Sequence, residues 1–87
     1  MPYIVGVDRD LLDTGIDRIE VQPVTIGQLN YFITKILLRY MRFNGGPSYT
    51  MYNTLVGVLE CVKLEMYRRQ ISNYEDERCD LNGDVYV

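Results

Sequence analysis

The 87-residue sequence contains no histidine and no tryptophan, and only two of its residues are cysteine. Histidine is the usual general base and the commonest metal ligand, so its absence excludes Ser-His and Cys-His nucleophile pairs and most zinc sites. A basic excess is missing too, because 9 Lys and Arg stand against 12 Asp and Glu, a formal charge of −3. Bulk nucleic acid is therefore not an expected partner, although a small basic pocket is compatible with this charge.

Long hydrophobic runs are absent as well. The apolar stretches are too short to span a bilayer, and the opening residues MPYIVGVDRD lack the form of a secretory signal peptide. Cys61 lies in an apolar helical stretch, where cysteine serves as a small core residue, whereas Cys79 lies in a charged segment that should be exposed. No disulfide is expected, and the sequence predicts a reduced, cytoplasmic protein without a membrane segment.

Tyrosine is the abundant aromatic residue, at eight positions. Its ring combines a flat apolar face with a polar tip, which suits interfaces and planar ligands. An apolar fraction of 47% is typical of a folded protein, and the length predicts a single helical domain over residues 1–87. So short a chain buries only a small core and is often stabilised by self-association, so we expect a homo-oligomer.

Two helices are predicted in the first half of the chain. The first should begin at Asp8, which can cap it, and end near Val21, because Pro23 disfavours helical geometry at the residue before it. The second should begin at Thr25, where Thr25 and Gln28 fit the capping-box pattern. Its apolar residues recur at helical spacing until an Asn-Gly-Gly sequence stops it.

A third helix should be the longest element, beginning at either Pro47 or Ser48 and running to about Tyr74. Because its connection to the second helix is short, the two should pack antiparallel as an αα-hairpin. Apolar residues on the third helix follow a heptad-like spacing, which leaves an apolar surplus for another subunit. These residues are Tyr52, Leu55, Leu59, Val62 and Met66.

Both ends of the chain have strand character. The opening MPYIVGV is β-leaning, and Asn82-Gly83 between residues 78–81 and 84–87 is a hairpin-turn signal. Alternatively, the last residues pair with residues 2–5 of the same chain or of a neighbour. The predicted fold class is mainly α, with two long antiparallel helices, a shorter N-terminal helix and short β segments or a hairpin at the chain ends.

Acidic residues suggest two kinds of metal site, and neither fits. The alternation of Asp80, Asn82 and Asp84 is like the start of a calcium loop, but the sixth position holds Val85 in place of the required Gly. Helical nucleotide pyrophosphohydrolases hold magnesium through carboxylates at i and i+3 on facing helices. Here a lysine follows Glu60 at i+3, so a helix-surface ion pair is the better interpretation.

Motifs for covalent catalysis and for phosphate loops are absent from the sequence. We therefore expect no catalytic residue, no metal, no cofactor and no enzymatic activity. The magnesium-dependent hydrolase stays open as an alternative that would require the carboxylates.

Cations and tyrosines form two clusters. Lys35, Arg39 and Arg42 recur on one side of the second helix, with Tyr31 at the head of the stripe. The second cluster lies near the end of the third helix, and in an antiparallel hairpin it is distant from the first, so combining them requires a second protomer. Arginine binds phosphate bidentately and tyrosine stacks on bases. The alternative is a solvated charged face. Candidate ligand-binding residues are Tyr31, Lys35, Arg39, Tyr67, Arg68, Arg69 and Tyr74.

Several short motifs occur in a fixed order: MPYI, LNYFIT, GVLECVKLEMYRR, NYEDE and NGDVYV. Together they span nearly the whole chain, and they resemble a family of short uncharacterised proteins of bacteriophages and bacteria. Cys79 departs from the family pattern, which tends to have a lysine or another polar residue there.

The resemblance implies a biological setting and no specific chemistry. Small phage proteins often act by stoichiometric binding, and sponges for cyclic nucleotide signals are small, oligomeric and non-catalytic. We therefore expect an oligomeric protein in the host cytoplasm that sequesters a phosphate-bearing nucleotide at a subunit interface. The alternative is a protein-interaction module that inhibits a host factor.

Overall fold

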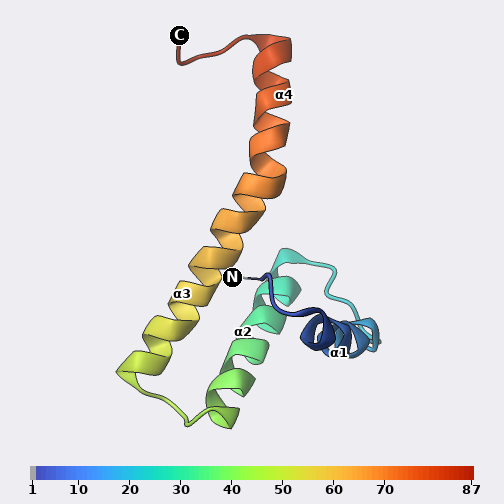
Figure 1. Cartoon of the computed structure of the whole chain (residues 1–87), viewed down its shortest axis with the longest axis vertical. Helices are drawn as coiled ribbons and strands as arrows, with labels where there is room; N and C mark the ends of the chain where they lie inside the picture. The colour runs from blue at the N-terminus through green and yellow to red at the C-terminus, as the bar shows by residue number, and fades with distance from the viewer. Residues whose placement is uncertain (1) are drawn as a thin grey trace. The chain divides into compact units, whose positions relative to one another are not determined.

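The computed structural model describes residues 2–87, which are mainly helical and contain no strand (Figure 1). The chain divides into two compact units, residues 2–55 and residues 56–87. The first unit holds α1 (Gly6–Asp17), α2 (Ile26–Phe43) and the start of α3 (Tyr49–Met66). The second holds the rest of α3, a π-helical segment η1 (Tyr67–Ile71) and α4 (Ser72–Asn82). The helical fold class is confirmed, whereas the antiparallel packing of the two long helices and the single domain stay predictions.

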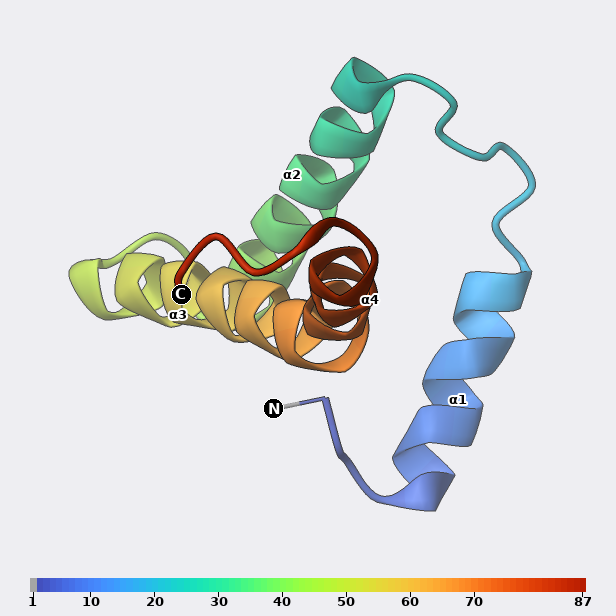
Figure 2. The same cartoon turned by 90° about the horizontal axis from the view of Figure 1, so that it is seen from above.

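Helix α1 spans Gly6–Asp17, so both predicted ends were wrong. Its N-cap is Val5, which makes no side-chain cap. At the other end the amide of Arg18 donates to the Gly15 carbonyl at 3.3 Å, a tightened i→i+3 turn that closes the helix. Residues 18–25 then form an irregular connection to α2 (Figure 2). Residues 2–5 form no strand either, because β-leaning residues need a neighbouring strand to complete their hydrogen bonds.

Helix α2 spans Ile26–Phe43 and confirms the predicted capping box. The backbone amide of Gln28 donates to Thr25 Oγ1 at 3.1 Å, and Gln28 Oε1 accepts from the backbone amide of Thr25 at 3.0 Å. The helix ends where Gly45 and Gly46 adopt φ of +107° and +82°, and the Gly46 amide donates back to the Met41 carbonyl at 2.8 Å. This bond, from an amide to the carbonyl five residues earlier, is typical of a Schellman-type helix end. The positive φ angles that this end requires are accommodated without strain by glycine.

Helix α3 spans Tyr49–Met66. Of the two predicted starts, Ser48 is the cap, because its Oγ accepts from the Met51 amide at 3.0 Å. The π-helical segment η1, Tyr67–Ile71, and helix α4, Ser72–Asn82, follow without a break. Helical structure therefore continues well beyond Tyr74 (Figure 1).

The predicted C-terminal hairpin was wrong. Gly83 has φ of +93° and its amide donates to the Cys79 carbonyl at 2.9 Å, so it ends α4. A hairpin turn and a helix end both need a residue that adopts positive φ, and an Asn-Gly pair suits either one. The local sequence therefore does not distinguish a hairpin from a helix end. Beyond it, Asp84 Oδ1 accepts from the Tyr86 amide at 2.8 Å, so a side chain closes the last turn and no strand forms.

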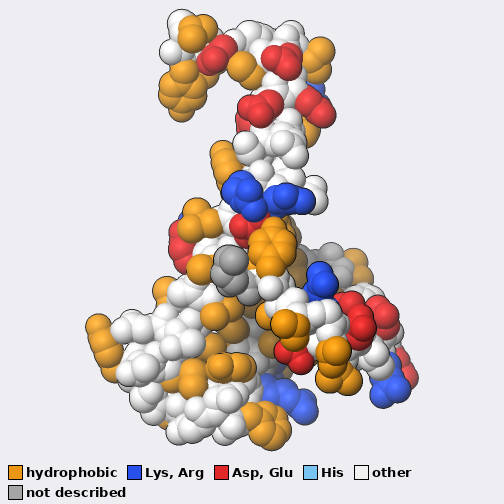
Figure 3. All heavy atoms as spheres, in the orientation of Figure 1, with side chains coloured by type: hydrophobic (Ala, Val, Ile, Leu, Met, Phe, Trp, Pro, Cys, Tyr) orange, Lys and Arg blue, Asp and Glu red, His pale blue; other side chains and the backbone are white. Residues whose placement is uncertain are grey.

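Burial is the feature that differs most from expectation, because no residue among 2–87 is buried. Hydrophobic side chains lie on the visible surface of the molecule (Figure 3). Cys61, expected in a core, is exposed, and Cys79 is half-buried. Within residues 2–87 no helix has the length and apolar character needed to cross a membrane.

Candidate functional site

A hollow of about 390 Å³ lies along one face of α2. Lys35, Arg39 and Arg42 line it, because steps of four and three residues return to the same side of a helix. The remaining lining is apolar and comes from Phe32 and Ile36 of α2 and from Ile19 in the connection that follows α1. The predicted grouping of Lys35 with Arg39 and Arg42 is thus present in the folded unit.

The cations of this hollow form no ion pair within their own unit. No acidic residue lines the hollow, and no ion pair forms among residues 2–55. Lys35 Nζ lies 5.9 Å from the centroid of the Tyr31 ring, and the Arg39 guanidinium lies 5.5 Å from that of Phe43. Such cation–π contacts position the cations and leave their N–H donors available to an anion.

Aromatic rings extend the site in both directions along α2. A neighbouring hollow of about 360 Å³ is lined by Arg39, Arg42 and Phe43. Another, of about 350 Å³, is lined by Tyr31 and Phe32 together with the residues that lead into α2. The basic face, defined here as Tyr31, Lys35, Arg39, Arg42 and Phe43, therefore offers flat rings next to phosphate-binding groups.

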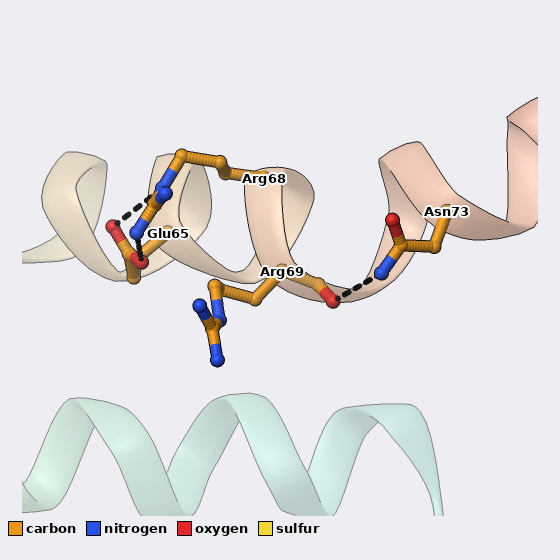
Figure 4. Close-up of polar contacts among 4 residues, drawn as sticks. All are labelled: Glu65, Arg68, Arg69 and Asn73. Atoms are coloured by element: carbon orange, nitrogen blue, oxygen red, sulfur yellow. Dashed lines mark hydrogen bonds and ion pairs between the residues drawn. The ribbon is translucent and has the colours of Figure 1, made fainter.

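Arg68 belongs to the other unit and is already engaged. Its Nη2 lies 2.6 Å from Glu65 Oε1 and its Nε lies 3.4 Å from Oε2, a two-point contact between guanidinium and carboxylate (Figure 4). A phosphate would have to displace that carboxylate. Arg68 is consequently a weaker candidate than the sequence suggested.

The other three predicted ligand-binding residues of this unit, Tyr67, Arg69 and Tyr74, differ in orientation and in the contacts that they make. The Arg69 guanidinium points to another side of the helix from Arg68, and its backbone carbonyl accepts from Asn73 Nδ2 at 3.0 Å (Figure 4). Tyr74 lies beneath the Arg78 guanidinium, 5.0 Å from Cζ to the ring centroid, and its hydroxyl accepts from Arg78 Nε at 3.0 Å. Tyr67 is about half exposed.

The structure therefore brings Tyr31, Lys35 and Arg39 together, and it places Tyr67, Arg68, Arg69 and Tyr74 in the second unit. Phe32, Ile36 and Phe43 were not among the candidate residues predicted from the sequence, and their side chains complete the lining of the hollows. A signal for Phe43 existed, since it stands four residues after Arg39 on the same helical face.

Two carboxylates of α3, Glu60 and Glu65, form surface ion pairs. Lys63 Nζ lies 3.1 Å from Glu60 Oε1, which confirms the helix-surface interpretation of that pair. Within residues 2–87, no three acidic or cysteine side chains come together in a group that could hold a metal ion. A further hollow of about 450 Å³ on α4 and the tail is lined by Glu75, Asp76 and Asp84, so its charge does not suit phosphate.

These features define a small, mainly helical protein with a basic, aromatic-flanked helix face. The chain belongs to the family described as domain of unknown function DUF6899, whose model matches residues 1–85. No curated protein and no solved structure matches the chain.

Proposed function

We propose that this protein binds a phosphate-bearing nucleotide on the basic face of α2 without transforming it. The observation that carries this proposal is the hollow lined by Lys35, Arg39 and Arg42, whose lining contains no carboxylate. Three cations on one helical face attract a multiply charged anion more strongly than they attract the singly charged anions of the surrounding salt.

Recognition would divide between charge and stacking. The forks of Arg39 and Arg42 would each donate two hydrogen bonds to phosphate oxygens, and Lys35 would add a point charge. The Tyr31 and Phe43 rings flank these cations and would stack on a base.

The setting we propose is a bacteriophage protein that acts in the host cytoplasm as an anti-defence sponge for a cyclic nucleotide signal. Binding would be stoichiometric, and a homo-oligomer would bring Tyr67, Arg69 and Tyr74 of another protomer toward the ligand. The short length, the eight tyrosines and the absence of a catalytic motif support this setting.

Calorimetry on the full chain tests the proposal, with a panel of cyclic di- and trinucleotides and ADP-ribose isomers as ligands. We expect Arg39→Ala to weaken binding of the active ligand roughly tenfold to a hundredfold, the usual loss for a charge-assisted hydrogen-bond pair. Arg9→Ala on α1 removes the same charge outside the basic face and should leave the affinity unchanged. Absence of binding across the panel, or equal losses in both variants, would refute the proposal.

A protein-interaction module is the second candidate, favoured by the lack of any buried residue among 2–87. Exposed tyrosines, such as Tyr31 at 66% and Tyr49 at 80%, are typical anchors of protein interfaces. Recovery of one stoichiometric host protein from lysate, lost on Tyr49→Ser and kept on Arg39→Ala, would favour this function over nucleotide capture.

A further inference from the structure

The π-helical segment η1 adds one residue to the helix of the second unit. The amide of Ser72 donates to the carbonyl of Tyr67, a spacing of five residues where an α-helix has four. One residue further along, the Asn73 side-chain amide donates to the Arg69 carbonyl at 3.0 Å (Figure 4). A side chain thus supplies a hydrogen bond where the regular ladder is interrupted.

The added residue joins two apolar stripes. In an uninterrupted α-helix, Ile71 would lie about 140° around the axis from Met66, because each residue turns about 100°. Absorbing one residue in the π turn reduces this offset to about 40°, the ordinary offset between neighbours on one helical face. The residues on either side then form one continuous stripe, which comprises Leu59, Val62, Met66, Ile71, Tyr74 and Leu81.

No element of residues 56–87 covers this stripe. Leu59 is 41% exposed, Met66 56% and Leu81 75%. A helix gains little stability from local propensity alone, so an apolar face of this length requires a packing partner.

Four of the six stripe residues are placed symmetrically about Gln70, whereas Val62 and Ile71 have Arg78 and Arg69 as their counterparts. Leu59 and Leu81 each lie eleven residues from Gln70, and Met66 and Tyr74 each lie four residues from it.

Charge changes sign on passing Gln70. Residues 63–69 carry three cations and one carboxylate, a net +2, whereas residues 71–77 carry three carboxylates and no cation, a net −3. Figure 3 shows several Asp and Glu side chains along α4.

We propose that a second copy of this chain covers the stripe in antiparallel orientation, with a twofold axis at the π turn near Gln70. Leu59 then packs on Leu81 of the partner subunit, and the basic segment of each copy faces the acidic segment of the other. A parallel pair would place like charges side by side, which disfavours it. The interface is isologous, because both copies use the same surface.

One ion pair follows from the register. Lys63 comes directly after Val62 of the stripe and Glu75 directly after Tyr74, so both lie on the same flank. In a twofold antiparallel pair the same flanks meet, and these positions stand seven residues before and five residues after Gln70. Lys63 therefore lies within reach of Glu75 of the partner subunit.

Cross-linking with a short bismaleimide tests the orientation, in the full chain carrying Cys61→Ser and Cys79→Ser. We expect Gln70→Cys to link to itself, and a mixture of Lys63→Cys and Glu75→Cys chains to link to each other. Lys63→Cys alone should not link, because the two copies of residue 63 are about 21 Å apart along antiparallel helices. Self-linking of Lys63→Cys would overturn the antiparallel orientation, and no linking at any position would overturn the interface.

Light scattering with size-exclusion chromatography gives a second measurement on the native sequence. We expect Ile71→Asp to convert dimers to monomers that keep their helical circular dichroism, and Asp76→Ala, on the opposite flank, to stay dimeric. Equal masses for Ile71→Asp and the native chain would contradict the proposal. This interface deepens the assembly proposed above. Its test is distinguishable from that of ligand capture, because Ile71→Asp and the cross-linking positions lie in residues 56–87, whereas the calorimetric variant Arg39→Ala lies on α2.

Discussion

At the scale of single residues, Thr25 shows how one side chain fixes the start of α2. Its hydroxyl accepts from the Gln28 amide, and the Gln28 side chain accepts from the amides of Thr25 and Val24. Three donors that would otherwise lack protein partners are satisfied by two side chains. The basic face starts at Tyr31, less than two turns further along, so its placement depends on this cap.

We expect Thr25→Ala to lower the free energy of unfolding by about 1 kcal/mol, the usual cost of a lost N-cap. Urea denaturation followed by circular dichroism measures it. Thr14→Ala is the matched control, because Thr14 Oγ1 only donates to the Asp10 carbonyl of its own helix at 3.0 Å. Equal effects of the two substitutions would mean that the capping box contributes nothing.

At the scale of helices, glycine acts in opposite ways at two positions. Gly83 has φ of +93° and ψ of 149°, a conformation that other residues rarely adopt, whereas Gly57 lies inside α3. A Cβ added at either position would meet no atom within 4 Å, so backbone conformation alone decides the effect.

Gly83→Ala should therefore destabilise the end of α4 by about 1–2 kcal/mol. Gly57→Ala should stabilise its helix by about 0.5–1 kcal/mol. Hydrogen exchange at the amides of residues 79–82 for the first variant, and thermal melting for the second, check the two signs. A stabilising Gly83→Ala would show that α4 does not end in the conformation described.

Helix boundaries show what the sequence could predict. The bounds of α2 were predictable, because a capping box and an Asn-Gly-Gly stop act within a few residues of the positions that they define. Asn82-Gly83 was ambiguous for the same local reason, since both helix ends and hairpins use positive φ. The π turn was not predictable from propensity, because its energetic benefit depends on which side chains it aligns with one another.

The candidate site was predictable to the same extent. Steps of four and three residues predicted the grouping of Lys35, Arg39 and Arg42. Helix spacing predicted a surface pair for Glu65 but did not decide its partner, because Arg68 and Arg69 both stand within about one turn of it. The structure shows that Arg68 makes the two-point contact.

At the scale of the whole molecule, stability should depend on protein concentration. Neither unit buries a side chain, and the association proposed above would supply apolar burial that neither unit provides. We expect the melting temperature to rise steadily between micromolar and millimolar concentration, as measured by circular dichroism in matched path lengths. A melting temperature independent of concentration would indicate that the chain folds without association.

The π turn also determines where this protein tolerates a change in length. Deleting Gln70 would convert the five-residue turn into an ordinary helical turn, and the stripe from Leu59 to Leu81 would stay aligned. Deleting Asp76 would instead rotate Leu81 by about 100° from the stripe, since each helical residue turns by that angle. Gln70 in η1 is thus dispensable, whereas Asp76, six residues later, is indispensable for the stripe, and the masses of the two deletion variants in solution should differ accordingly.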